Sequence, residues 1–131
     1  MEQTNMHDLA LTAARSRLLA MEMVHRAASG HIGGSLSAMD ILTELYFRVM
    51  RVNPEQPRDP ARDRFVLSKG HCTPALYPTL AQRGFFPVER LKEFRRIDGQ
   101  MSGHAEMHHV PGVDMSTGSL GQGISAAVGM A

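Results

Sequence analysis

The chain has 131 residues, of which 43% are hydrophobic and 21% are charged, with a formal net charge of +1. This composition is typical of one globular domain. A balanced charge without runs of Lys and Arg among aromatic residues argues against nucleic acid as a partner.

The single cysteine, Cys72, cannot form an internal disulfide. The opening segment, MEQTNMHDLA, lacks the basic flank and apolar stretch of a signal peptide. No apolar segment approaches the roughly 20 residues that a bilayer span requires. We therefore expect a reduced, cytoplasmic protein without a membrane partner.

Two amphipathic helices are predicted in the first part of the chain. Apolar residues recur at spacings of three and four over residues 8–28, and Gly30 is placed to end that helix. After a short loop, GHIGGS, Ser37 is expected to cap a second helix over residues 37–50, with Asp40 reaching back toward its first turn.

The middle of the chain alternates between loop, strand and helix signals. Three prolines and several charges predict a surface loop over residues 52–63, and the short apolar stretch RFVLS, residues 64–68, is the best strand candidate. A helix is expected from Thr73 to Gly84, with Pro78 tolerated near its first turn.

Toward the end of the chain we expect a short charged helix over residues 87–96, an irregular segment over 97–117, and a helix of small residues over 121–131. One strand among several helices is too few for a finished α/β domain of this size. The pattern favours the opening part of a larger sheet, and hence a fragment or a truncated product.

Each of three histidines follows a glycine: His31, His71 and His104. A preceding glycine allows a sharp turn and a close backbone approach, so such a pair can aim an imidazole into a cleft. Imidazole donates, accepts and exchanges protons near neutral pH, which suits carbonyl and alcohol chemistry. A single pair is usually only a turn with a half-exposed histidine, but three pairs at predicted element junctions favour one shared site.

The stretch HAEMHH is a candidate metal site, because it offers His104, Glu106, His108 and His109. Imidazole and carboxylate groups can bind zinc. The spacing does not match a helical zinc signature, so we expect a polar loop here and no metal ligands.

The stretch STGSLGQGIS places Gly118, Gly121 and Gly123 ahead of a predicted helix. Bare amides before a helix N-terminus can contact a polar or anionic ligand. On its own the signal is weak, because a flexible turn before a tightly packed helix would look the same.

Taken in order, the segments SGHIGGSLSAMDILTELYF, DRFVLSKGHCTPALY and GHAEMHHVPGVDMSTGSLGQGISAAVGMA resemble the N-terminal, thiamine-diphosphate-binding part of transketolase. The resemblance is closest to the N-terminal subunit of two-subunit transketolases. It implies an α/β fold in which residues 1–131 form a truncated, helix-rich N-terminal portion of a doubly wound domain with a parallel sheet.

The resemblance also implies roles for the three histidines. His31 and His104 match catalytic residues that contact the sugar substrate, and His71 matches a histidine that reaches the cofactor near its diphosphate. Such imidazoles can donate to a developing alkoxide and accept a proton from a hydroxyl group.

Gly118, Ser119 and Leu120 match the cofactor-binding triplet, and the ligands of the magnesium ion are expected beyond residue 131. Ile32 and Ser119 stand where many relatives have proline, and both variants suit the two-subunit branch. The glutamate that activates the cofactor belongs to a following domain or a partner chain in the family.

The implied activity is transfer of a two-carbon ketol (glycolaldehyde) unit between sugar phosphates. The expected partners are those sugar phosphates, a C-terminal transketolase subunit or domain, and a second copy of the enzyme. Two alternatives stay open. One is another thiamine diphosphate enzyme such as deoxyxylulose-phosphate synthase, and the other is a non-catalytic interaction fragment.

Overall fold

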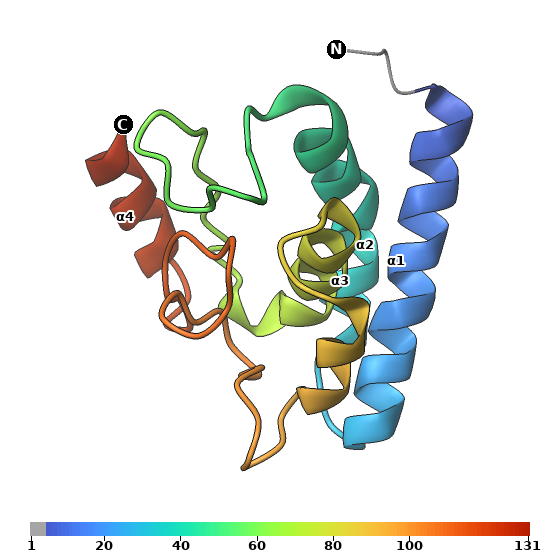
Figure 1. Cartoon of the computed structure of the whole chain (residues 1–131). Coiled ribbons are helices and arrows are strands. Elements are labelled where there is room, and N and C mark those ends of the chain that lie inside the picture. Colours follow the sequence, from blue (N-terminus) through green and yellow to red (C-terminus); the bar gives the residue numbers. More distant parts are fainter. Residues whose placement is uncertain (1–4) are drawn as a thin grey trace.

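The computed structural model describes residues 5–131. The opening segment, in which we expect no signal peptide, lies partly outside the described residues. The regular elements are all helical within this range (Figure 1). They are α1 (Met6–Ala27), α2 (Ile32–Glu44) with a π-helical turn (Leu45–Val49), a 3₁₀ turn (Gly70–Cys72), α3 (Thr73–Arg83), a 3₁₀ helix (Val88–Glu93) and α4 (Gln122–Met130). No described helix is long and apolar enough to cross a membrane.

Helices α1, α2 and α3 pack against one another, and the loops between α3 and α4 lie over one end of α3 (Figure 1). Apolar faces of the three helices form most of the core, which excludes water and stabilises the bundle. The buried residues include Ala13, Ala20, Met23, Met39, Leu42, Tyr46, Leu76, Tyr77 and Leu80.

The predicted first helix is confirmed, although it ends before Gly30. The side chain of Asn5 accepts a hydrogen bond from the amide of His7 and so caps the N-terminus. At the other end, Ala28 adopts the left-handed conformation (φ 49°) that the sequence pattern assigned to Gly30. The helix therefore ends at Ala27, one residue before the predicted end, and Ser29 and Gly30 lead to His31.

The prediction for the start of the second helix was wrong. Helix α2 begins at Ile32, inside the segment expected to be a loop. The hydroxyl of Ser35 donates to the carbonyl of His31 at 2.7 Å, and that of Ser37 donates to the carbonyl of Gly34 at 3.1 Å. Ser37 therefore does not cap the helix, because its hydroxyl bonds back along a turn that has already formed.

Asp40 has a different role from the expected one. Its carboxylate accepts two hydrogen bonds from the guanidinium of Arg17, at 3.0 and 2.6 Å, and so joins α2 to α1. Both side chains are partly or largely exposed, so this ion pair fixes the helix contact more than it stabilises the fold.

The strand expected at residues 64–68 does not form within the described part of the chain. A strand needs the backbone of a neighbour for its ladder of hydrogen bonds. Here side chains take that place: the amide of Phe65 donates to the carboxylate of Asp114 at 2.9 Å, and the carbonyl of Leu67 accepts from the hydroxyl of Thr117 at 2.7 Å. Residues 5–131 contain no sheet, so the parallel sheet stays a prediction.

The remaining helices agree with the predictions in type but not in every detail. Helix α3 starts at Thr73 and ends before Gly84, as expected, but Pro78 lies in its interior rather than near its first turn. The charged segment at 87–96 forms only a short 3₁₀ helix, and residues 97–117 are irregular as predicted. Helix α4 begins after Gly121, whose φ of +90° favours glycine.

Candidate functional site

His31 and His71 lie side by side where two helices begin. His31 is the residue just before α2, and His71 lies in the 3₁₀ turn that leads into α3. Their ring centroids are 4.8 Å apart, with the rings inclined at 65°. The packing of α2 against α3 therefore brings two of the three Gly-His motifs together.

The His71 imidazole has a lowered pKa. Partial burial is the main cause, followed by the positive charge that His31, His104 and Lys69 place around it. Both effects disfavour the protonated ring. At neutral pH His71 is thus held as a neutral imidazole that can donate from one nitrogen and accept at the other.

His104 reaches the same region from a loop and lies against the glycine-rich segment. A Cβ atom built on Gly118 would lie 3.4 Å from Cδ2 of His104. The effect of His104 on the pKa of His71 also reflects their proximity. The structure therefore gathers the three histidines and Gly118 in one region.

Helix α3 fixes the position of the His104 loop. The hydroxyl of Thr73 donates to the carbonyl of Gly103 at 2.9 Å. The hydroxyl proton of the buried Tyr77 is shared between the carbonyls of Ser102 and His104, at oxygen–oxygen distances of 3.0 and 3.1 Å. Because both donors come from a packed helix, the loop carries its imidazole at a defined place.

A short backbone ladder joins the motifs that carry His71 and His104 to the glycine-rich segment. The amide of Ala105 donates to the carbonyl of Gly70, and the amide of Thr117 donates to the carbonyl of Ala105, both at 3.1 Å. A Cβ atom on Gly70 would lie 2.5 Å from the carbonyl oxygen of Thr117. Only glycine permits this approach, which explains the glycine before His71.

Lys69 contributes to the site, and sequence analysis missed it. Its ammonium group donates to the carbonyl of Gly34 at 2.7 Å, which ties the His71 turn to the first turn of α2. A Cβ atom on Gly34 would lie 2.9 Å from the sulfur of Cys72, so the two turns pack closely. The only sequence signal was the position of Lys69 two residues before His71.

A largely buried ion pair joins Arg62 to Asp114, shortly before the glycine-rich segment, and sequence analysis missed it too. The guanidinium of Arg62 donates to the carboxylate of Asp114 at 2.9 and 2.5 Å, with side-chain exposures of 16% and 6%. The other carboxylate oxygen accepts from the amide of Phe65. Nothing in the local sequence distinguishes these residues from ordinary surface charges.

The three residues of the predicted cofactor triplet differ in their surroundings. Gly118 faces His104, whereas Ser119 and Leu120 are exposed, and Leu120 has 72% of its surface accessible. They lead into α4, whose N-terminus is not capped by any described side chain. A cavity of about 300 Å³ lies along this turn, lined by Met115, Ser116, Thr117, Gly118, Ser119, Gln122 and Gly123. The uncapped amides at the start of α4 suit a polar, anionic ligand.

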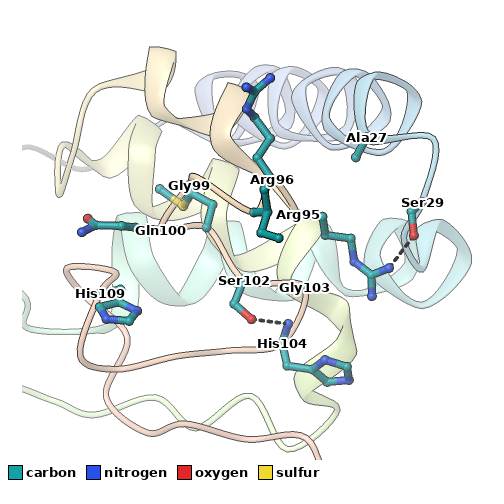
Figure 2. Close-up of a pocket in the computed structure, with 12 residues that line it drawn as sticks. Ala27, Ser29, Arg95, Arg96, Gly99, Gln100, Ser102, Gly103, His104 and His109 are labelled. Atoms are coloured by element: carbon teal, nitrogen blue, oxygen red, sulfur yellow. Dashed lines mark hydrogen bonds between the residues drawn. The ribbon is translucent and has the colours of Figure 1, made fainter.

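A larger pocket of about 550 Å³ opens beside His104 (Figure 2). It lies between the end of α1 and the loop that follows the 3₁₀ helix. Among the described residues that line it are arginines and histidines but no carboxylate. The polar residues of its wall are Ser29, Arg95, Arg96, Gln100, Ser102, His104 and His109.

The segment considered as a candidate metal site is organised by Glu106. One carboxylate oxygen accepts from the amides of His108 and His109 at 3.0 and 2.8 Å, and the other accepts from the hydroxyl of Ser116 at 3.2 Å. Partial burial raises the pKa of Glu106, but these hydrogen bonds outweigh it and the net shift is downward. Among residues 5–131, no group of three or more His, Cys, Asp and Glu residues is arranged to bind a metal.

Comparison with protein families gives a match over residues 9–131 to the family described as transketolase, thiamine diphosphate binding domain. Among curated relatives, one subunit of a 6-deoxy-6-sulfo-D-fructose transketolase from Clostridium sp. is 50% identical over 124 residues, which cover 95% of this chain and 45% of the relative. One subunit of an apulose-4-phosphate transketolase from Phocaeicola vulgatus is 46% identical over 94% of this chain and 43% of its own length.

Solved structures show the same relationship. Transketolase from Leishmania mexicana superposes with a TM-score of 0.88 at 37% identity, covering 92% of this chain and 18% of that one. A transketolase from Pichia stipitis, in complex with sedoheptulose-7-phosphate, gives 0.86 at 42% identity over 90% of this chain and 18% of its own. The chain therefore spans less than half the length of these relatives.

Proposed function

Because this chain belongs to the family of the transketolase thiamine diphosphate binding domain, we propose that it forms one wall of a transketolase active site. The proposed reaction transfers a two-carbon ketol unit from a ketose phosphate to an aldose phosphate. The observation that carries this proposal is the meeting of His31, His71 and His104 beside Gly118.

In this proposal, His71 and the 118–120 turn contact the cofactor. When bound, thiamine diphosphate supplies the nucleophilic carbon and the electron sink of the reaction. A neutral His71 and the uncapped amides at the start of α4 can hydrogen-bond to an anionic group. We place the magnesium ligands beyond residue 131; the Mg²⁺ ion that they hold would neutralise charge on the diphosphate.

His31 and His104 are proposed to contact the donor sugar. Both side chains are exposed in this structure and flank His71. An imidazole N–H can donate to the oxygen of the ketose carbonyl, where negative charge develops in the transition state. The other imidazole can accept the proton of a donor hydroxyl when the carbon–carbon bond breaks.

The partners follow from the same premise. Two relatives are named as subunits, and this chain spans under half of each. We therefore propose that the missing part of the site comes from further sequence, from a C-terminal subunit or domain, and from a second copy. The doubly wound parallel sheet and the cytoplasmic location belong to this proposal.

An interaction fragment without catalysis is the second candidate. One face of α4 and the turn before it is apolar and exposed: Leu120, Ile124 and Val128 have 72%, 65% and 73% of their surfaces accessible. Such a face suits contact with more protein. It favours assembly with another chain, but it does not by itself argue against catalysis.

The test is an activity measurement on the full-length protein mixed with its C-terminal partner. With thiamine diphosphate, Mg²⁺, a ketose phosphate and an aldose phosphate, ketol transfer should appear only when both proteins are present. In a parallel assay in which pyruvate replaces the ketose phosphate, consumption of pyruvate with release of CO₂ would instead support the synthase alternative. Stable association without either reaction would support the interaction fragment.

A further inference from the structure

Arg95 has an unusual backbone for its residue type. Its φ is +56°, in the left-handed region that a long side chain rarely occupies. The segment is fixed on both sides: the amide of Arg95 donates to the carbonyl of Met101 at 2.9 Å, and the preceding Phe94 is buried. Strain of this kind persists where the surroundings hold it in place, and it is common at functional sites.

The strained backbone directs the guanidinium of Arg95 between two turns of the site (Figure 2). On one side, Nη1 donates to the hydroxyl of Ser29 at 2.5 Å. Ser29 lies two residues before His31. Arg95 therefore reaches the turn that carries the first histidine.

On the other side, the guanidinium lies against the backbone of Gly103. A Cβ atom built at position 103 would collide with Nε, and it would lie 2.7 Å from Nη2 and 2.8 Å from Cζ. Gly103 directly precedes His104. The same planar group therefore touches the turns of both histidines that we propose to contact the donor sugar.

The neighbouring arginine shows that this arrangement is specific. Arg96 is bound to the carboxylate of Asp98 by two hydrogen bonds of 3.0 Å, and both side chains are largely exposed. Within residues 5–131, Arg95 has no carboxylate partner, and its guanidinium is directed to a hydroxyl and a backbone instead. Arg96 thus provides a matched control of equal charge.

We propose that Arg95 is a positioning residue that sets the separation of the His31 and His104 turns, and thereby the fit of the donor sugar. This inference rests on the function proposed above. The mechanism requires no new chemistry: a rigid guanidinium plane acts as a spacer between two turns. Small displacements of groups that orient a substrate can lower rates by orders of magnitude, with 1 Å costing about 100-fold.

Two variants test the role in the full-length enzyme with its partner. Arg95→Gln removes the guanidinium, and Ser29→Ala removes only its hydrogen-bond partner. We expect kcat/KM for the ketose donor to fall by about 10-fold to 100-fold in Arg95→Gln, since orientation effects have this size. Ser29→Ala should give a smaller fall, and the two losses should not add. The Kd for thiamine diphosphate should stay unchanged, because the proposed cofactor contacts lie at His71 and residues 118–120.

The variant Arg95→Lys tests whether a positive charge at position 95 is enough to maintain kcat/KM. Lysine keeps the charge and can reach a hydroxyl, but it lacks the planar fork that lies on Gly103. If Arg95 acts as a spacer, the lysine variant should recover less than half of the lost kcat/KM. Full recovery would show that the charge, and not the spacing, is what the site requires.

A readout that does not depend on activity is the NMR signal of the imidazole Cε1–H groups in the same protein with ¹³C-labelled histidine. Arg95→Gln should shift the signals of both His31 and His104 and leave that of the distant His7 in place, while Arg96→Gln should shift none of them. If Arg95→Gln lowers kcat/KM without moving either signal, the residue acts on the substrate directly and the positioning role is wrong.

The proposed function and the positioning role can fail separately. An inactive wild-type assembly would overturn the function, and the histidine signals would then decide the positioning role alone. An active wild type, with Arg95→Gln equal to Arg96→Gln in both kcat/KM and histidine signals, would overturn the positioning role only. If Arg95→Gln does not fold, Ser29→Ala supplies the same comparison with a smaller change.

Discussion

The imidazole rings of His31 and His71 lie 4.8 Å apart, although the whole of α2 separates them in the sequence. Each ring belongs to the turn that begins a helix, so the packing of α2 on α3 sets their separation. Two imidazoles this close resist carrying a positive charge together.

His71 should titrate below the ordinary histidine value of about 6.5. Its folded pKa is lowered by partial burial and then by the charges of His31, His104 and Lys69. The unfolded chain therefore binds the proton more readily, so stability from neutral His71 is present above the unfolded pKa and is lost as the pH falls toward the folded value. Histidine NMR signals followed against pH in the full-length protein would measure the midpoint.

The variant His31→Gln should raise the pKa of His71, because it removes one neighbouring charge. His104 and Lys69 still lower the pKa of His71 in this variant, so the midpoint should stay below that of free histidine. An unchanged midpoint would show that the two rings do not interact in solution. His7→Gln, at the far end of α1, is the matched control.

Asp114→Ala should destabilise the protein strongly. The change leaves the guanidinium of Arg62, whose side chain is 16% exposed, without its carboxylate, and removing one partner of a buried pair costs about 3–5 kcal/mol. Urea denaturation of the full-length protein would measure this loss. Asp98→Ala, which removes an exposed partner of Arg96, should produce no measurable change, and equal effects of the two variants would contradict the structural role of Asp114.

Gly70→Ala should impair both stability and cofactor binding. The added methyl group would lie 2.5 Å from the carbonyl oxygen of Thr117, so the glycine-rich segment must move. Overpacking of this kind costs about 1–3 kcal/mol. Gly33→Ala is the control, because nothing lies within 4 Å of its Cβ position, and this variant should retain wild-type cofactor affinity. If both variants bind the cofactor like the wild type, the close contact at Gly70 does not shape the site.

His104→Ala should lower the turnover of the complete enzyme while leaving its affinity for thiamine diphosphate largely intact. The loop that holds His104 is fixed through the backbone carbonyls of Ser102, Gly103 and His104, which the variant retains. Removing a proton donor or acceptor in catalysis typically costs about 100-fold to 10,000-fold. Steady-state kinetics and a cofactor titration on the same preparation would separate the two effects.

Sequence patterns predicted the features that depend on neighbouring residues in the chain, namely the helices and the turns between them. The apolar periodicity of α1 and the glycines at 84 and 121 correctly marked helices, and the glycine–histidine pairs marked turns that the structure brings together. The start of α2 was misjudged because Ser37, the expected cap, donates to the carbonyl of Gly34 inside a helix that already begins at Ile32.

Other features could not be predicted because they depend on partners distant in the sequence. Residues 64–68 have the composition of a strand, but a strand forms only beside another, and the described chain offers Asp114 and Thr117 instead. In the sequence, Arg95 cannot be distinguished from other surface charges, and only the structure shows its guanidinium between Ser29 and Gly103. Periodicity carries no information about such contacts.

We propose above that the turns around His71 and Gly118 bind thiamine diphosphate. Calorimetric titration of the cofactor with Mg²⁺ into the full-length protein and its partner tests it directly, with His71→Ala as the comparison. We predict binding by the wild type and an affinity about tenfold weaker in the variant, the loss expected for one hydrogen bond to a charged group. Absence of binding by the wild type, or equal affinities, would contradict it.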